Sequence, residues 1–390
     1  MKPPNGTGNQ ELIALIHDEI IANGGRIVFA RFMELALYHP IHGYYMSESR
    51  RPGRGGDFIT APEVTAHFGH AVARQMAECW ERLGSPDEWS IREYGAGIGG
   101  LAYDIMAGLA TYAPRAFEAL TYHLVELNPF QRAEASRSMT EIGLAGKVVI
   151  ESPDVSTSPI TGVILANEVA DALPVHRLEM TDEGWMEGYV SWDGDGFDWT
   201  LDEFSPEAEA SFMELADANL DFSFDDIVEV SPAAAAWFDK AIEGLERGYV
   251  VIIDYGYPAT VLYSSHRLDG TLRGYSGHTV SDDPFTNVGL QDLTAHVDFT
   301  SLRKSGEASG LTHAGYTMQG AFLSSLGLGD VLVGMQDDPA ATIKEYLATQ
   351  AVILRLIDPA GLGRFGIMIM ARDAPVEPPL RAFKEAPPDF

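Results

Sequence analysis

The stretch Glu93-Tyr-Gly-Ala-Gly-Ile-Gly-Gly100 decides the fold of this chain. It follows the short apolar run Ser90–Tyr94 and opens the helical pattern Leu101–Thr111, which indicates a turn between a strand and a helix. Glycines in such a turn let the backbone approach a ligand where side chains would collide with it. On its own the pattern is a weak signal for a dinucleotide, so its surroundings must decide the ligand.

Short apolar runs alternate with helical patterns on both sides of this turn. Such alternation is typical of a parallel sheet whose strands are joined by crossover helices, and we therefore predict an α/β fold with seven strands. After the first strand, Ser90–Tyr94, the predicted strands are Thr121–Val125, Lys147–Ile150, Val163–Ala166, Tyr249–Ile253, a short one near Leu311–His313, and Phe365–Ala371.

The residues that precede the glycine turn have helical spacing at Glu11–Asn23, Phe29–Tyr38 and Glu63–Leu83. We predict that this part forms an N-terminal helical cap with a loop that covers the cofactor. The predicted domains are this cap over residues 1–88, a core over 89–177 and 230–390, and an α+β insertion over 178–229 that is a candidate substrate lobe.

The acidic segment Leu178–Asp239 holds 18 Asp and Glu residues and neither Lys nor Arg. The whole chain has 26 basic and 57 acidic residues, a net charge of −31, which excludes a nucleic-acid partner because a polyanion would be repelled. Within the segment we predict a hairpin of Trp185–Trp192 with Phe197–Leu201, followed by a helix over Pro206–Asn219. The acidic residues of this segment either form a solvated surface or create an electrostatic field that attracts a cationic substrate. The sequence is compatible with both interpretations.

The chain has a single cysteine, Cys79, which excludes an internal disulfide and a thiolate metal cage. No stretch approaches the roughly 20 apolar residues of a membrane span, and the N-terminus has neither an apolar signal core nor an Arg-rich presequence. We expect a cytoplasmic protein without a membrane span. The pairs His39/His42 and His67/His70 lack further convergent ligands, so we expect no metal site.

The carboxylate Glu93 lies two residues before the first glycine of the turn. A carboxylate at this place would repel the negatively charged pyrophosphate of a dinucleotide. S-adenosylmethionine instead carries a sulfonium and an ammonium, which a carboxylate attracts. Glu126 ends the second strand, where it can accept both ribose hydroxyls, and Asp154 follows the third strand, where it can accept from the adenine amino group. The alternative for Glu93, an ordinary capping or salt-bridge residue, stays open. The predicted donor contacts near these acids are Gly95, Ala96, Gly97, Leu127, Val155 and Asn167.

Several blocks of the sequence resemble the MidA family of class I methyltransferases. The first blocks are Phe32–Pro40, Gly43–Tyr45 and Gly56–Glu63, and the match continues through the glycine turn. Later blocks are Asn167–His176, Asp254–Gly256, Gly289–Phe299 and Gly315–Gln319. As an ordered set spread over about residues 30 to 370, they identify the chain as a member of this family.

The resemblance implies a class I (Rossmann-like) seven-stranded methyltransferase sheet and S-adenosylmethionine as the methyl donor. For the eukaryotic members, which assemble mitochondrial complex I, it implies methylation of an arginine in a protein subunit. It also implies that the loop after Gly56 folds over the amino-acid end of the donor, through Asp57, Phe58, Thr60 and Pro62. The acceptor of this chain is not settled by the resemblance.

Three polar residues follow the fourth predicted strand, at the sheet edge where a class I methyltransferase presents its acceptor. We predict that Glu168 and Asp171 bind a guanidinium and that Asn167 positions it, although either acid could instead cap the next turn. His296 and His176 are candidate proton acceptors, with a structural hydrogen bond as the alternative for each. The long connection Tyr255–Phe299 suggests a functional lid.

The predicted function is thus a methyltransferase that acts on an exposed arginine of a protein or peptide. A small-molecule O- or N-methyltransferase on the same fold, and a non-catalytic assembly factor that binds S-adenosylmethionine, are the alternatives. A small anionic acceptor would be repelled by Glu168 and Asp171 unless these were protonated or paired. The sequence is compatible with a homodimer and does not determine the oligomeric state.

Overall fold

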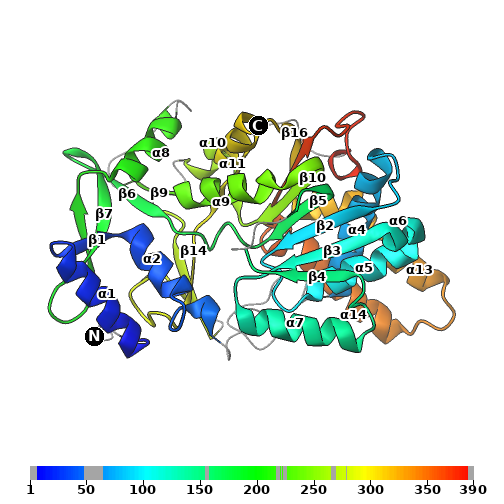
Figure 1. Ribbon diagram of the computed structural model, residues 1–390, viewed down its shortest axis with the longest axis horizontal. Helices are drawn as coiled ribbons and strands as arrows, with labels where there is room; N and C mark the ends of the chain where they lie inside the picture. Colours follow the sequence, from blue (N-terminus) through cyan, green and yellow to red (C-terminus); the bar gives the residue numbers. More distant parts are fainter. Residues whose placement is uncertain are drawn as a thin grey trace. The chain divides into compact units, whose positions relative to one another are not determined.

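The computed structural model describes residues 7–47, 65–153, 158–216, 220, 222, 226–264, 269–277 and 279–384. The chain forms two compact units (Figure 1). Unit 1 comprises Met1–Phe58, Ala170–Phe238 and Gly256–Leu302, and unit 2 comprises Ile59–Val169, Asp239–Tyr255 and Arg303–Phe390. These units divide the chain differently from the domains expected above, whose boundaries stay a prediction.

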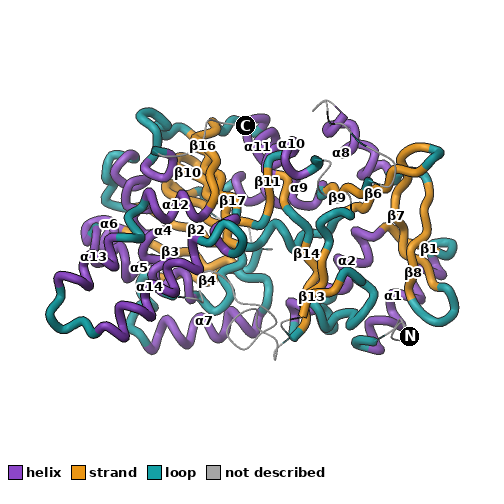
Figure 2. Tube along the Cα trace, turned by 180° about the vertical axis from the view of Figure 1, so that it is seen from behind, coloured by secondary structure: helices purple, strands orange, loops and turns teal. Residues whose placement is uncertain are grey.

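Unit 2 contains a seven-stranded sheet, which confirms the predicted α/β fold (Figure 2). Its strands lie in the order β16-β17-β10-β5-β2-β3-β4. The five strands from β10 to β4 are parallel, whereas β17 is antiparallel to both of its neighbours. The bounds are β2 (Trp89–Tyr94), β3 (Leu120–Val125), β4 (Val148–Glu151), β5 (Ile160–Asn167), β10 (Leu245–Asp254), β16 (Thr312–Met318) and β17 (Gly366–Arg372).

The register brings the carboxyl ends of the central strands to one edge of the sheet. Tyr94 is opposite both Val125 and Ala166, and Ile253 is opposite Asn167. Because parallel strands all end at the same edge, the segments that follow β2, β3, β5 and β10 leave the sheet side by side. Of the predicted donor and acceptor residues, Gly95–Gly97, Glu126, Leu127 and Glu168 come from these segments, and Glu93 and Asn167 lie at the carboxyl ends of β2 and β5.

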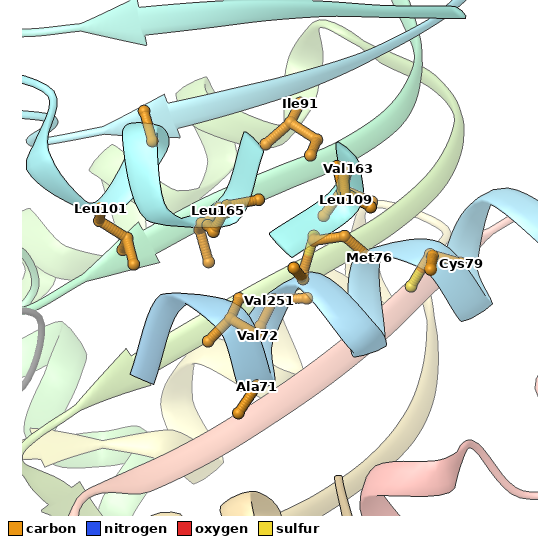
Figure 3. Close-up of a cluster of buried hydrophobic side chains, with 14 of the residues drawn as sticks. Ala71, Val72, Met76, Cys79, Ile91, Leu101, Leu109, Val163, Leu165 and Val251 are labelled. Atoms are coloured by element: carbon orange, nitrogen blue, oxygen red, sulfur yellow. The ribbon is translucent and has the colours of Figure 1, made fainter. Parts of the chain in front are cut away.

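Two helices, α4 (Ala66–Arg82) and α5 (Gly100–Tyr112), cover one face of the sheet with a continuous apolar core (Figure 3). Val72, Met76 and Cys79 of α4 pack with Ile91 and Val163 of the strands. Cys79 is a fully buried residue of this core, and burial raises the pKa of its thiol to about 12. The other helices of this unit are α6 (Pro114–Ala119), α7 (Pro129–Glu141), α12 (Gln319–Ser325), α13 (Asp330–Asp337) and α14 (Ile343–Ile357).

Unit 1 combines the N-terminal helices with the acidic segment. Its larger sheet has the order β1-β7-β6-β9, with β8 paired to β7. The N-terminal part therefore contributes a strand as well as the predicted helices, and Phe29 and Phe32 of that part pack with Phe197 and Phe285. The bounds are α1 (Gln10–Ala22), β1 (Arg26–Val28), α2 (Phe29–Tyr38), β6 (His176–Thr181), β7 (Gly184–Trp192), β8 (Phe197–Asp202), α8 (Pro206–Ala216) and β9 (Ile227–Val230).

The segment from Tyr255 to Phe299 is folded, so its description as one long loop is wrong. It forms a three-stranded antiparallel sheet in the order β13-β12-β14 and a parallel pair, β11 with β15. Strands of two to four residues carry too little alternation to be seen in the sequence. The bounds are β11 (Gly256–Tyr257), α10 (Ala259–Leu262), β12 (Arg273–Ser276), β13 (Thr279–Ser281), β14 (Asp292–Thr294) and β15 (Val297–Asp298).

Two further helices, α9 (Pro232–Glu243) and α11 (Phe299–Ala308), carry the chain from unit 1 to unit 2. Among the described residues, no helix has both the length and the apolarity that a membrane crossing requires.

Candidate active site

The glycine turn follows β2 directly and opens α5, as predicted. Gly95 and Gly97 have φ of +66° and +56°, a left-handed conformation that favours glycine. A Cβ at Gly95 would lie 2.7 Å from Cγ2 of Val169, and one at Gly97 would lie 3.2 Å from Oε1 of Gln131. The N–H of Ala96 donates to the Val125 carbonyl over 3.2 Å, which fastens the turn to the end of β3.

Glu126, the first residue after β3, holds the same turn from the other side. Its Oε2 accepts from the N–H of Gly97 over 2.9 Å, and its Oε1 accepts from the N–H of Asn128 over 2.7 Å. Arg132 donates to the carbonyls of Glu126 and Leu127. Burial raises the pKa of the Glu126 carboxyl, and the backbone donors at Asn128 and Gly97 oppose this shift.

Glu93 is buried inside the sheet, with an exposed fraction of 3%. The hydroxyl of Tyr122 on the neighbouring strand donates to its Oε2 over 2.7 Å. Burial raises the pKa of Glu93 to about 8; the Tyr122 hydrogen bond lowers it and the charge of Glu126 raises it further. Glu93 is thus a buried acid close to a second acid, Glu126.

Asn167 and Glu168 lie at the carboxyl end of β5. The Asn167 amide Nδ2 donates to Oε1 of Glu168 over 3.2 Å. The Asn167 Oδ1 atom is buried and has no hydrogen-bond partner among the described residues. Glu168 has a φ of +54°, a conformation rarely adopted by residues other than glycine, asparagine and aspartate, and its N–H donates to the Ile253 carbonyl over 2.9 Å.

Asp254 is a residue of this edge to which the sequence analysis gave no role. It ends β10, its carboxylate is buried, and it accepts from the backbone N–H groups of Val169 and Tyr255. The only signal in the sequence was its place in the block Asp254–Gly256, which carried the family resemblance but suggested no role.

The other predicted acceptor residues belong to unit 1. The Asp171 carbonyl accepts from the N–H of Ala295 over 2.9 Å. Burial raises the pKa of Tyr45, and the charges of Asp292 and Asp171 raise it further. The backbone N–H of His296 donates to Oγ1 of Thr271, and its ring lies 5.8 Å from that of Tyr257. Their roles in catalysis stay predictions.

His176, the other candidate proton acceptor, takes part in a buried hydrogen bond of unit 1. Its Nδ1 lies 2.6 Å from Oε1 of Glu187, a carboxylate that is fully buried. The second oxygen of Glu187 accepts from the N–H of Ser205 over 2.6 Å. This geometry agrees with the structural alternative given for His176.

Six predicted donor contacts, Asp57, Phe58, Thr60, Pro62, Asp154 and Val155, lie outside the described residues. Within the described ranges, no group of three or more His, Cys, Asp or Glu side chains could hold a metal ion.

A model for a family of S-adenosyl-L-methionine-dependent methyltransferases (Methyltransf_28) matches residues 71–317, well over half of the chain. The chain belongs to this family. The match confirms the resemblance found in the motifs, and S-adenosylmethionine is therefore the methyl donor of this enzyme. The described residues fit such a donor, because a glycine turn at the end of a parallel strand lies beside the carboxylate of Glu126.

This methyltransferase is similar over nearly its full length to a solved structure. A protein from Burkholderia thailandensis, described as a "likely methyl transferase" and crystallised with S-adenosyl-homocysteine, is 32% identical with a TM-score of 0.86. The alignment covers 97% of this chain and 95% of that one.

The methyltransferase is also similar to curated mitochondrial proteins. The protein arginine methyltransferase NDUFAF7 homolog of Drosophila melanogaster is 30% identical over 352 residues, which cover 82% of this chain and 76% of the relative. The human protein arginine methyltransferase NDUFAF7 is 28% identical over 349 residues, with coverage of 82% and 75%.

Proposed function

We propose that this methyltransferase transfers the methyl group to a guanidinium nitrogen of an arginine in a protein acceptor, and that Asn167 and Glu168 bind this guanidinium. The observation that carries the proposal is the buried Oδ1 of Asn167, which has no partner among the described residues. A carboxylate can only accept hydrogen bonds, so Glu168 directs the amide nitrogen of Asn167 toward itself and leaves the amide oxygen to accept from a ligand.

The chemistry of these two side chains suits a guanidinium. A guanidinium carries five N–H donors and no acceptor, so a carboxylate and an amide oxygen, which only accept hydrogen bonds, suit it. A buried polar atom without a partner costs about 1–3 kcal/mol, which a donor on the ligand would recover. The curated relatives are named protein arginine methyltransferases, which supports the same acceptor class.

S-adenosylmethionine, when bound, supplies a methyl carbon on a sulfonium and leaves as S-adenosylhomocysteine. Glu168 would fix the guanidinium plane so that one nitrogen faces this carbon, and its charge would stabilise the cation until a proton leaves. Glu126 would accept the ribose hydroxyls of the donor. Glu93 and the backbone of Gly95–Gly97 and Leu127 would line the remainder of the donor site, together with the six predicted contacts outside the described residues.

Asp171 and His296 remain predictions as a second guanidinium ligand and as a proton acceptor. The cytoplasmic location and the homodimer also stay predictions, and the relatives are named as mitochondrial proteins. Cell fractionation and sedimentation velocity test these two points.

The test is to incubate the enzyme with an isotopically labelled methyl donor and lysate of its host, and to identify the labelled atom by mass spectrometry. Methylarginine in a protein is the expected product. A label on a hydroxyl, on a carboxylate or on a small molecule would contradict the proposal. It would support the alternative hypothesis of a small-molecule O- or N-methyltransferase on the same fold.

The matched variants are Glu168→Gln and, as a control, Glu141→Gln at an exposed position of α7. Glu168→Gln should lower transfer at least about 100-fold, since one charged hydrogen-bonded contact in a transition state contributes about 3 kcal/mol. Its affinity for S-adenosylhomocysteine should stay within about threefold of wild type. Glu141→Gln should change neither quantity, and full transfer by Glu168→Gln would remove Glu168 from the mechanism.

A further inference from the structure

The carboxylate of Asp254 joins the ends of two neighbouring strands of unit 2. Its Oδ2 accepts from the N–H of Val169 over 3.1 Å, just beyond β5, and its Oδ1 accepts from the N–H of Tyr255 over 2.7 Å, just beyond β10. Asp254 is only 1% exposed. A buried carboxylate that accepts from two backbone donors on different strand ends is a rigid connection between them.

Glu168 occupies the left-handed region of backbone space at φ +54°, immediately before the N–H that Asp254 holds. For a glutamate this conformation is unfavourable, and it persists only where the surroundings enforce it. Its own N–H donates to the Ile253 carbonyl, so the peptide groups on both sides of its Cα are fastened to β10. Strain of this kind is concentrated at functional sites.

Tyr255, the second residue whose N–H donates to Asp254, is itself held by contacts of its side chain. The Tyr255 hydroxyl accepts from Nε of Arg364, whose guanidinium carbon lies 4.6 Å from the centre of the Tyr255 ring. The ring of Phe365 packs edge-on against Tyr255 at 4.5 Å between centroids. Arg364 and Phe365 immediately precede β17, so Tyr255 is anchored to the strand next to β10.

We propose that Asp254 is a positioning residue that holds Glu168 in its left-handed conformation and so directs the Glu168 carboxylate toward the acceptor. This proposal rests on the proposed function, because Glu168 is the acceptor ligand there. Both oxygens of Asp254 accept from backbone N–H groups, and in this proposal Asp254 acts through the peptide between Glu168 and Val169.

The first experiment measures methyl transfer by Asp254→Asn, alone and together with Glu168→Gln. Asparagine has the same shape but turns an amide NH2 toward one of the two N–H donors, so the connection is broken on one side. Asp254→Asn should lower kcat about 10- to 100-fold and leave the affinity for S-adenosylhomocysteine within about threefold. When it is added to Glu168→Gln, Asp254→Asn should lower transfer by a further factor of less than about two. Multiplicative effects of the two substitutions would overturn the proposal.

The second experiment needs no acceptor and therefore stands apart from the proposed function. Glu168→Gly removes the left-handed strain and should raise Tm by about 2–4 °C in the wild-type background. In the Asp254→Asn background the strain is already relaxed, so the same change should raise Tm by less than about 1 °C. An equal gain in both backgrounds would overturn the proposal.

A matched control distinguishes positioning from ordinary stabilisation. Glu78 is another carboxylate of unit 2 that accepts from a backbone N–H, that of Arg381, at 2.9 and 3.1 Å. Glu78→Gln should lower Tm. It should leave kcat per donor-binding site unchanged, and Glu168→Gly should still raise Tm by the full amount in the Glu78→Gln background.

If Asp254→Asn does not fold, Asp254→Ser, which retains one acceptor, takes its place in both experiments. If no arginine is labelled but the Tm coupling is present, the proposed function fails and the role of Asp254 in holding Glu168 stands.

Discussion

Glu93 shows how strongly the sheet changes the chemistry of a single residue. Its pKa is about 8, against an ordinary value of 4.5, chiefly because burial disfavours the charged form. The folded protein therefore keeps a proton between these two pH values that the unfolded chain releases. The contribution of Glu93 to stability is present below about pH 4.5 and is lost as the pH rises through about 8.

The variant Glu93→Gln tests this linkage in the donor-free protein. Glutamine is always neutral, so Tm should fall between pH 5.5 and 8.5 by several degrees less in the variant than in wild type. Differential scanning fluorimetry over this range measures the difference, and Glu141→Gln should keep the wild-type profile. Identical pH profiles of wild type and Glu93→Gln would show that Glu93 is ionised throughout.

At the residue scale, the sequence predicts the position of an acidic residue in the fold better than it predicts the conformation and the contacts of that residue. Glu126 and Glu168 were found because each follows a buried apolar run, which marks the carboxyl end of a parallel strand. The left-handed conformation of Glu168 has no signal in the sequence, since glutamate is not a residue that favours it. The role proposed for Asp254 was missed because the N–H of Val169, from which it accepts, lies 85 positions away and is a backbone group.

At the scale of elements, the glycine turn and the end of β5 depend on each other. A methyl group at Gly95 would lie 2.7 Å from Cγ2 of Val169, and the φ of +66° is unfavourable for alanine. We therefore expect Gly95→Ala to cost about 1–3 kcal/mol of stability and to weaken S-adenosylhomocysteine binding at least about tenfold. Chemical denaturation and titration calorimetry measure the two effects.

Two further variants separate the collision from the backbone strain at Gly95. Adding Val169→Ala should recover the part of the loss that comes from the collision and none of the part that comes from φ. Gly146→Ala is the control, because a Cβ there would have nothing within 4 Å and its φ is not positive. Wild-type stability of Gly95→Ala would show that the turn rearranges freely.

The elements that the sequence predicted are those with long continuous signals. The central strands β5 and β10 contain the buried, uninterrupted apolar runs Val163–Ala166 and Tyr249–Ile253, which are typical of parallel strands that are covered on both faces. The strands β1, β9 and β11 have two to four residues and were missed. Their pairing depends on partners far along the chain, as when Arg26–Val28 pairs with residues 189–191 of β7, and no local pattern encodes such a partner.

At the scale of the whole molecule, the negative charge is concentrated in one unit. Unit 1 holds 9 basic and 29 acidic residues, so it carries −20 of the net charge of −31. Most of these acids come from residues 178–238, which include strands β7, β8 and β9 of the sheet of unit 1, and the exposed ones give this segment an acidic surface. Such a surface attracts a basic acceptor over distances of about one Debye length, roughly 10 Å at 0.1 M salt.

We expect kcat/KM toward an arginine peptide with basic flanking residues to fall roughly five- to tenfold between 50 and 300 mM salt. The effect should lie in KM, while kcat and the affinity for S-adenosylhomocysteine stay nearly constant. A peptide with uncharged flanks is the control and should show little change. Salt independence with the basic peptide would mean that the acidic segment is only a solvated surface.

The division into two units is what the sequence could least predict. Unit 1 is built from three separate segments of the chain, and the sequence offers only local cues at their boundaries. The net charge and the acidic segment were visible from composition. That Phe29 and Phe32 of the N-terminus share a core with Phe197 and Phe285 follows from packing between distant segments.

The place of β17 in the sheet has a consequence for how this protein is made. This strand lies between β10 and β16, yet it is the last of the seven strands of this sheet to be synthesised. Until residues 366–372 have emerged, β10 exposes an unpaired edge along its apolar run Tyr249–Ile253. A nascent or truncated chain that stops before residue 366 should thus be an aggregation-prone chaperone client, even though all of its proposed donor and acceptor residues have already been synthesised.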